Sequence, residues 1–144
     1  MSGPGSILFV CRHNAIRSPM AAALARVHLP HVYIRSAGVD PVPPDPFAVA
    51  VMREKGLDLS QRRPRKLEEL GDTSFDLVVT LAPEAHHHML EMARTQSFDV
   101  QYWPTLDPSG VHGSRGQILD SYRTCRDQLD MTIVKRLMGG DAAS

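Results

Sequence analysis

The chain has few cysteines, few aromatic residues and no long apolar segment. Two cysteines, Cys11 and Cys125, are too few for a disulfide framework and favour a reducing compartment. No apolar run approaches the roughly twenty residues that a membrane-spanning helix needs. The formal net charge of +0 argues against a broad basic surface for nucleic acid. We therefore expect a cytoplasmic protein without a membrane or nucleic-acid partner.

The length of 144 residues suits one domain with a core of its own. No internal repeat, low-complexity segment or long linker divides the chain. We expect a single domain over residues 1–144, in which residues 1–5 are a disordered or vector-derived extension, because this segment is short and polar.

Short apolar runs alternate with amphipathic stretches along the chain. This pattern predicts strands over residues 6–10, 31–35, 75–81 and 100–103, and helices over residues 19–29, 46–55, 65–70, 84–94 and 114–137. The continuous apolar run in 75–81 is typical of a parallel strand that is covered on both faces. The alternation predicts an α/β fold, a three-layer α/β/α sandwich around a parallel sheet.

The loop after the first strand carries the most distinctive residues. Cys11 and Arg17 stand six positions apart, and Ser18 and Pro19 follow them. Serine suits a helix N-cap and proline suits the first helical position, so a helix is predicted to begin here. Free N–H groups and the helix dipole attract anions to such a place. The carboxyl ends of parallel strands are also where ligands bind in this fold class.

These residue types predict a nucleophile beside an anion site. A helix N-terminus and a nearby arginine both stabilise a thiolate, which makes Cys11 a candidate nucleophile. The planar fork of Arg17 matches two oxygens of a tetrahedral oxyanion. Asn14 tolerates the left-handed backbone that a tight anion-binding loop demands. The alternative is a buried cysteine in an ordinary turn with Arg17 on the surface.

The chain resembles the low-molecular-weight protein tyrosine phosphatase family, which includes the thioredoxin-coupled arsenate reductases. The resemblance covers nearly the whole chain. It rests on Cys-x5-Arg-Ser at 11–18, Ser36-Ala37-Gly38, Trp103-Pro104, Asp107-Pro108-Ser109, Gly113-Ser114-Arg115 through Tyr122-Arg123, and Arg126-Asp127. The resemblance implies a four-stranded sheet in the flavodoxin-like order 2-1-3-4.

The predicted chemistry is metal-independent hydrolysis of a phosphomonoester, without a cofactor. Cys11 attacks phosphorus, Arg17 and the loop N–H groups stabilise the phosphoryl oxygens, and water then hydrolyses a cysteinyl-phosphate. The resemblance implies that Asp107 is the general acid. It also implies support from Ser36 and substrate binding by the remaining loop residues, Arg12, His13, Asn14, Ala15, Ile16 and Ser18. Asp-Pro-Ser-Gly is also strong turn chemistry, so Asp107 could simply start a turn.

Three departures from the family pattern bear on specificity. His13 replaces a glycine of many relatives and adds bulk at the rim of the loop. Ile16 replaces a second cysteine that protects the nucleophile in many phosphatases of the family. Ser109 and Gly110 replace tyrosines that often flank an aromatic substrate, so an aromatic wall must come from elsewhere, with Phe47 and Trp103 as candidates. Packing in the core or at a hinge is the favoured interpretation of Trp103.

Two other functions compete with hydrolysis. Arsenate reduction needs further thiols to resolve a cysteinyl–arsenic intermediate. Ala82 stands where such a reductase carries one, and Cys125 is best explained as a packed thiol. A protein that only binds anions is the third possibility. The expected ligands are a phosphorylated protein (on tyrosine or arginine) or a small phosphoester, with phosphate, vanadate or arsenate as simple anions.

Two further runs have ordinary explanations. The basic run 62–66 is interpreted as a solvated loop or helix start, and docking of an acidic partner is the minority interpretation. The run His86-His87-His88 predicts no metal site, because adjacent residues on a helix point about 100° apart and cannot share one metal.

Overall fold

The structure is a computed structural model that describes residues 3–70 and 74–139. Four parallel strands form one sheet in the order β2-β1-β3-β4. The strands are β1 (Ser6–Cys11), β2 (Tyr33–Gly38), β3 (Leu77–Thr80) and β4 (Asp99–Tyr102). The α/β class and the strand order 2-1-3-4 are as predicted.

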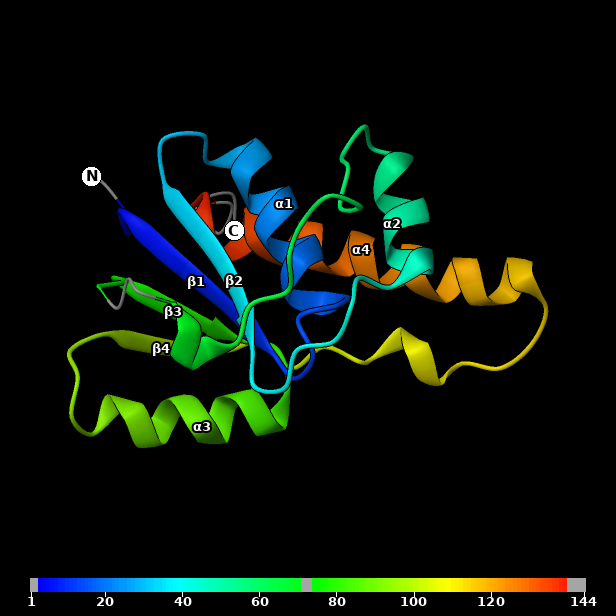
Figure 1. The fold of residues 1–144 in the computed structure, drawn as a ribbon. Coiled ribbons are helices and arrows are strands. Elements are labelled where there is room, and N and C mark those ends of the chain that lie inside the picture. The colour runs from blue at the N-terminus through cyan, green and yellow to red at the C-terminus, as the bar shows by residue number, and fades with distance from the viewer. Residues whose placement is uncertain (1–2, 71–73, 140–144) are drawn as a thin grey trace.

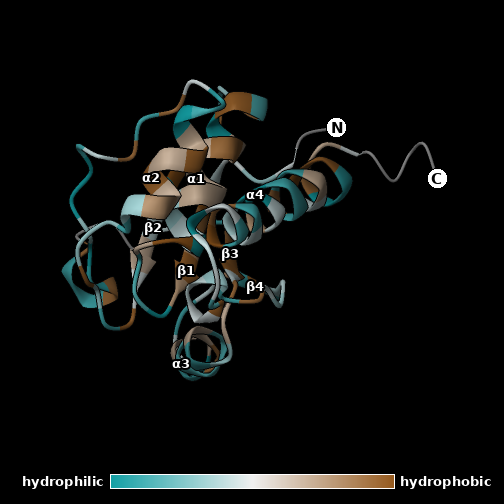
Figure 2. Ribbon diagram, turned by 90° about the vertical axis from the view of Figure 1, so that its right-hand side faces the viewer, coloured by the Kyte–Doolittle hydropathy of each residue, from teal (hydrophilic) through white to brown (hydrophobic). Residues whose placement is uncertain are grey.

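Helices cover both faces of the sheet, which makes three layers (Figure 1). One face is covered by α3 (Pro83–Ala93), and the other by α1 (Arg17–His28), α2 (Pro46–Arg53) and α4 (Arg115–Leu137). Figure 2 shows hydrophobic residues along the strands between these helices. Two 3₁₀ turns, η1 (Leu67–Glu69) and η2 (Pro108–Gly110), complete the described elements.

Two buried clusters fill the space on either side of the sheet. The larger lies under α1, α2 and α4 and includes Phe9, Met20 and Tyr122. The smaller lies under α3 and η1 and includes Val10 and Met89. Both strand faces are therefore apolar, which explains the continuous apolar runs of the central strands.

β2 and α1 depart from the predicted bounds. β2 continues to Gly38 because Ser36, Ala37 and Gly38 stay in parallel register with the end of β1. α1 begins at Arg17, and its N-cap is Ile16, without a side-chain cap. Ser18 is therefore not the cap that its sequence position predicted.

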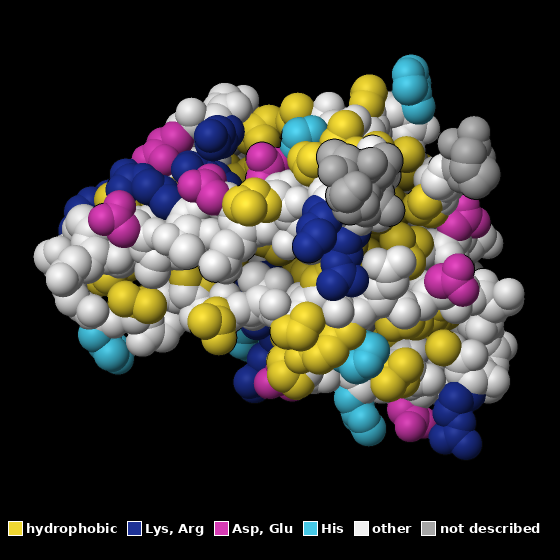
Figure 3. Space-filling view, turned by 180° about the vertical axis from the view of Figure 1, so that it is seen from behind, with side chains coloured by type: hydrophobic (Ala, Val, Ile, Leu, Met, Phe, Trp, Pro, Cys, Tyr) yellow, Lys and Arg dark blue, Asp and Glu magenta, His cyan; other side chains and the backbone are white. Residues whose placement is uncertain are grey.

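Polar contacts join α2 to α4. Arg123 and Arg126 of α4 both form ion pairs with Glu54 at 2.8 Å. Acidic and basic side chains lie side by side on the back of the molecule (Figure 3). The hydrogen bond from His28 to Asp130 at 2.7 Å ties α1 to the same helix.

The helices and the first residues bear on two expectations from the sequence, the absence of a membrane span and the N-terminal extension. No helix within the described ranges is both long and apolar enough to cross a membrane. Residues 1 and 2 of the expected N-terminal extension lie outside the described part of the chain. Gly5 donates its N–H to Asp76 Oδ2 at 2.8 Å, and its carbonyl accepts from Tyr33.

Replacing Asp45 with alanine is expected to lower the free energy of unfolding by about 1–2 kcal/mol. Asp45 Oδ1 caps α2 by accepting from Phe47 N at 2.8 Å and Ala48 N at 3.2 Å. Its Oδ2 accepts from the Tyr122 hydroxyl at 3.0 Å. Burial and the Asp45 carboxylate raise the pKa of Tyr122, so this hydroxyl stays a donor.

Urea unfolding of the parent, Asp45→Ala and Asp45→Asn measures this effect. The asparagine variant keeps a capping oxygen and should lose much less stability. Equal losses in both variants would contradict the assignment of the cap.

Candidate active site

A turn of five residues connects β1 to α1 and wraps around the Cys11 sulfur. We call residues 12–16 the anion loop. Asn14 has φ 52°, the left-handed conformation that the sequence predicted. In this conformation its backbone N–H donates to Cys11 Sγ at 3.3 Å. The turn therefore points an N–H group at the candidate nucleophile.

Other segments of the chain bind the carbonyl groups of Cys11 and of the first four residues of the loop. The segment 39–45 donates N–H groups to the carbonyls of Cys11, Arg12, His13 and Ala15, at 2.8–3.4 Å. The Arg62 guanidinium donates to the carbonyl of Asn14 at 2.9 Å. In contrast, the N–H groups of His13, Ala15 and Ile16 have no protein acceptor among the described residues. Outward carbonyls with free N–H groups are the arrangement of a backbone anion site.

Side chains behind the loop hold Asn14 in place. Its amide Nδ2 donates to Ser18 Oγ at 2.8 Å and to Ser36 Oγ at 3.1 Å. Its Oδ1 accepts from Arg62 Nη2 at 2.7 Å and from the Arg65 backbone N–H at 2.9 Å. Both oxygen and nitrogen of this buried amide are thus satisfied, which offsets the cost of the left-handed backbone.

Ser18 lies against the sulfur instead of capping the helix. Its Oγ is 3.0 Å from Cys11 Sγ and 3.3 Å from the carbonyl of Ala37. The hydroxyl carries one hydrogen, so it can donate either to the carbonyl or to a thiolate. The hydroxyl thus lies within hydrogen-bond distance of the candidate nucleophile.

Arg17 is buried at the first turn of α1 and reaches across the site. Its Nη1 donates to the carbonyl of Thr105 at 2.9 Å, and its Nη2 lies 3.7 Å from Asp107 Oδ2. These contacts place the guanidinium between the anion loop and the segment that follows β4. Arg17 is therefore not the surface arginine of the alternative interpretation.

Asp107 stands at the N-cap of η2, on the far side of the cleft from the loop. Burial raises the pKa of this carboxyl. Hydrogen bonds from the Ser109 N–H (2.9 Å) and hydroxyl (2.7 Å) stabilise the carboxylate and so lower the pKa. With the charges of Arg17 and His13, these bonds hold the pKa of Asp107 below its usual range. The turn and the carboxyl belong together, since the turn presents the carboxyl to the cleft.

The loop, Arg17 and Asp107 surround one cleft of about 250 Å³. Cys11 lies at its base, and His13, Ala15 and Ile16 line it. The opposite wall is aliphatic and rigid, made by Val42, Pro43, Pro44 and Pro46, with Asp45 and Ser109 completing the lining. This wall could not be predicted from the sequence, because a proline-rich loop does not indicate which surface it packs against.

Five residues that the sequence suggested for substrate contact do not line the cleft. Phe47 packs on Tyr122 and Trp103 packs on Phe9, so neither supplies an aromatic wall. The Arg12 side chain points to Glu84 at 3.7 Å and does not line the cleft. Asn14 and Ser18 are buried behind the loop and act on it from there. Trp103 is 3% exposed, in agreement with core packing.

Arg62 is the residue that the sequence interpretation missed. The basic pattern of 62–66 predicts a solvated loop, and Arg63, Arg65 and Lys66 are indeed exposed. Arg62, however, turns inward to Asn14 and to Ser36 Oγ at 3.2 Å. Nothing in a run of basic residues marks the one that points inward.

The three adjacent histidines have separate surroundings. His86 bonds to Thr80 Oγ1 at 2.9 Å and stacks on Tyr102, whereas His88 Nε2 lies 3.4 Å from Glu68. No group of three or more His, Cys, Asp or Glu side chains in the described ranges could hold a metal ion.

Comparison with known proteins identifies the family. Residues 6–137 match the family described as low molecular weight phosphotyrosine protein phosphatase. The chain belongs to this family. Probable low molecular weight protein-tyrosine-phosphatase EpsP of Ralstonia nicotianae is 42% identical over 79 residues, 53% of this chain. The match spans 54% of the EpsP length, about half.

A protein-arginine-phosphatase of Geobacillus stearothermophilus is 32% identical over 143 residues and covers 93% of this chain and 94% of its own. Among solved structures, the YwlE arginine phosphatase from G. stearothermophilus has a TM-score of 0.76 at 27% identity, covering 97% and 95% of the two chains. An arsenate reductase in the phosphate binding state has a TM-score of 0.74 at 26% identity, covering 96% and 98%. Relatives of this fold thus include both phosphatases and arsenate reductases.

Peroxide is expected to oxidise Cys11 without forming a Cys11–Cys125 disulfide. Cys125 is buried, and burial raises its pKa to about 12, so its thiol does not ionise to resolve a sulfenic acid. Mass spectrometry of unreduced peptides after peroxide treatment checks this. A peptide pair that joins the two cysteines would refute the prediction.

Proposed function

We propose that this protein is a metal-independent phosphomonoesterase that acts through a cysteinyl-phosphate, in the cytoplasm. The observation that carries the proposal is the anion loop: its carbonyls are bound by the protein, three of its N–H groups have no acceptor among the described residues, and it lines one cleft with Cys11 and Arg17. Such donors suit the equatorial oxygens of a phosphoryl group and are fixed before the substrate arrives. Family membership supports the same chemistry.

The reaction has two displacements. The Cys11 thiolate attacks phosphorus, an S–P bond forms, the P–O bond to the leaving group breaks, and Asp107 gives its proton to the departing oxygen. Water then attacks phosphorus and the S–P bond breaks, while the Asp107 carboxylate accepts the water's proton. Ser18 donates to the sulfur when it leaves as a thiolate. Inorganic phosphate is released and the free enzyme is restored.

The substrate class follows from the cleft wall. The wall lacks an aromatic side chain and is built from prolines and Val42. Such a wall offers no ring that could stack on the ring of phosphotyrosine. It can accept the aliphatic stem of a phosphoarginine or a small phosphoester. The likeness to a protein-arginine-phosphatase over 93% of the chain agrees with a phosphoarginine protein as substrate.

Hydrolysis is favoured over arsenate reduction because the second cysteine is unsuited to redox relay. Cys125 is buried and its pKa is raised to about 12, so it does not act as the resolving thiolate. Arsenate and vanadate are expected as phosphate-like inhibitors of the same loop.

Turnover of p-nitrophenyl phosphate in the presence of EDTA tests the proposal. Hydrolysis that persists with EDTA, with a phosphoryl group trapped on Cys11 after acid quench, is the expected result. A protein that binds phosphate and vanadate but releases no p-nitrophenol over a wide pH range would be an anion-binding protein. A protein that turns over arsenate with thioredoxin would be a reductase.

The rate of hydrolysis is expected to fall as pH rises, because Asp107 must carry a proton to act as the acid. The lowered pKa of Asp107 restricts the protonated form to acidic solution. Asp107→Asn should lose about 10²–10⁴ in kcat on phenyl phosphate. The loss should be smaller on p-nitrophenyl phosphate, whose leaving group needs less protonation.

Ser109→Ala is the matched test of this pH dependence. It removes the hydroxyl that donates to Asp107 at 2.7 Å, so the pKa of Asp107 should rise and the falling limb should move to higher pH. If the rate of hydrolysis falls over the same pH range in Ser109→Ala, Asp107→Asn and the parent, a group other than Asp107 controls the pH dependence.

A further inference from the structure

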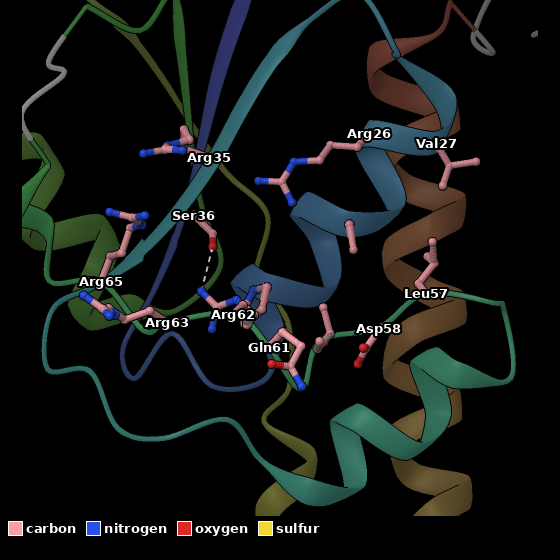
Figure 4. A pocket seen from close by; sticks show the side chains of 13 residues that line it. Arg26, Val27, Arg35, Ser36, Leu57, Asp58, Gln61, Arg62, Arg63 and Arg65 are labelled. Atoms are coloured by element: carbon pink, nitrogen blue, oxygen red, sulfur yellow. Dashed lines mark hydrogen bonds between the residues drawn. The ribbon is translucent and has the colours of Figure 1, made fainter.

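A second and larger hollow lies behind the anion loop, between α1, the end of β2 and the segment 57–65. Its volume is about 630 Å³. Figure 4 shows its lining, in which Arg26 extends from α1 and Arg62 reaches Ser36. We call it the arginine pocket, because it is lined by Arg26, Arg35, Arg62, Arg63 and Arg65.

The positive charge of the arginine pocket is not balanced within the described part of the chain. None of its five arginines forms an ion pair with a described carboxylate. The single acidic residue in the lining, Asp58, accepts from Ser60 and lies 3.9 Å from Arg53, which is outside the pocket. The lining therefore carries five arginines and one carboxylate, which leaves a large excess of positive charge.

Some of these guanidinium groups are also poorly solvated. Arg35 Nε is buried and has no hydrogen-bond partner, although its side chain lies over the Tyr33 ring. Burial and the neighbouring charges of Arg26 and Arg65 lower the pKa of Arg62 to about 10. Burial and the charge of Arg35 lower the pKa of Arg26. Repulsion among these charges is a cost that an anion in the pocket would reduce.

We propose that the arginine pocket binds a small anion that carries two or more phosphate groups. Guanidinium forks recognise phosphate oxygens in pairs, and five of them exceed what one phosphate can occupy. The volume falls within the range of about 300–1,000 Å³ of small-molecule sites. The lining holds aliphatic residues such as Leu57 and Leu59 but no aromatic ring, so recognition rests on the phosphates and not on a nucleobase.

Arg62 connects this pocket to the catalytic cleft. Its Nη1 and Nη2 donate to Asn14 and Ser36, which hold the anion loop. An anion in the pocket balances the Arg62 charge without taking these bonds, since the Nε–H makes no protein contact in the described ranges. Occupancy therefore stabilises the anion loop from behind.

Isothermal titration with methylenediphosphonate, which cannot be hydrolysed, tests the proposal on the full chain. Arg17→Met removes the cleft as a competing site, so binding that persists in this variant is the expected result. Adding Arg35→Gln and Arg63→Gln should weaken that binding by about tenfold or more per arginine. Adding Arg94→Gln, at the C-cap of α3 and outside the pocket, should not change it.

Circular dichroism confirms that each variant is folded, and a parent titration in parallel should show one more site than Arg17→Met. Loss of all binding in a folded Arg17→Met variant would overturn the proposal. Equal affinity with and without the two pocket substitutions would also overturn it. An acidic hexapeptide that binds through Arg35 and Arg63, while the diphosphonate does not, would overturn the assignment of a small phosphate ligand. Hydrolysis by the parent is measured separately, so neither result depends on the other.

Discussion

Replacing Cys11 with serine is expected to abolish phosphate release and to leave phosphate binding intact. A serine hydroxyl keeps its proton near neutral pH and is a far weaker nucleophile than a thiolate, so it begins the first displacement very slowly. The loss in kcat should be on the order of 10⁴ or more, as for other nucleophiles whose removal stops the covalent route. The donors around the sulfur stay, because Asn14 N–H and the loop geometry do not depend on the atom they face.

Steady-state kinetics on p-nitrophenyl phosphate, with phosphate binding followed by ³¹P NMR, separates the two effects. Ser18→Ala serves as the control, because it removes only the hydroxyl 3.0 Å from the sulfur and should slow turnover far less. A Cys11→Ser variant that still hydrolyses the ester at a comparable rate would show that another group is the nucleophile. Loss of phosphate binding as well would show that the sulfur itself shapes the loop.

Replacing Gly38 with alanine is expected to destabilise the protein and to disable the anion loop. A Cβ at this position would lie 2.8 Å from Asn14 N, 2.9 Å from Asn14 Cβ and 3.0 Å from the Arg12 carbonyl oxygen. Two of these three atoms are backbone, so the loop itself must move. Overpacking of this kind costs about 1–3 kcal/mol. A displacement of about 1 Å in the positioned donors lowers the rate by about 10²-fold.

Urea unfolding and kcat/KM measure both consequences in one variant. Gly116→Ala is the control, since its Cβ would come no closer than 3.9 Å to another atom, Ser114 Oγ. It should keep full activity and near-parent stability. Parent-like activity in Gly38→Ala would mean that the loop tolerates the displacement and that close approach of β2 is not required.

Much of the fold could be predicted because its signals are local. Alternating apolar and amphipathic stretches predicted the four strands in order, and the predicted bounds differ from the observed ones by a few residues. The larger differences have a tertiary cause. β2 extends to Gly38 because β1 pairs with it residue by residue, although Ser36, Ala37 and Gly38 lack a strand-like pattern.

The candidate site divides in the same way. Asn14 could be assigned a left-handed backbone from its residue type and its place in a tight loop. The role of Ser18 could not be predicted. A serine followed by a proline looks like a helix start at Pro19, but the helix begins two residues earlier, at Arg17. The suggestion that Phe47 or Trp103 forms an aromatic wall of the cleft was wrong for a similar reason. These two rings pack on Tyr122 and Phe9, which are distant in sequence.

The sequence by itself determined the fold class, the strand order through the family resemblance, and the residues proposed to carry the chemistry, Cys11, Arg17 and Asp107. These depend on periodicity, spacing and residue type, which are properties of short segments. Only the tertiary structure decided that Arg62 holds Asn14, that prolines form the cleft wall, and that five arginines surround a second pocket. Those facts depend on which surface segments 39–46 and 57–65 pack against, and contacts between distant segments leave no periodic trace in the chain.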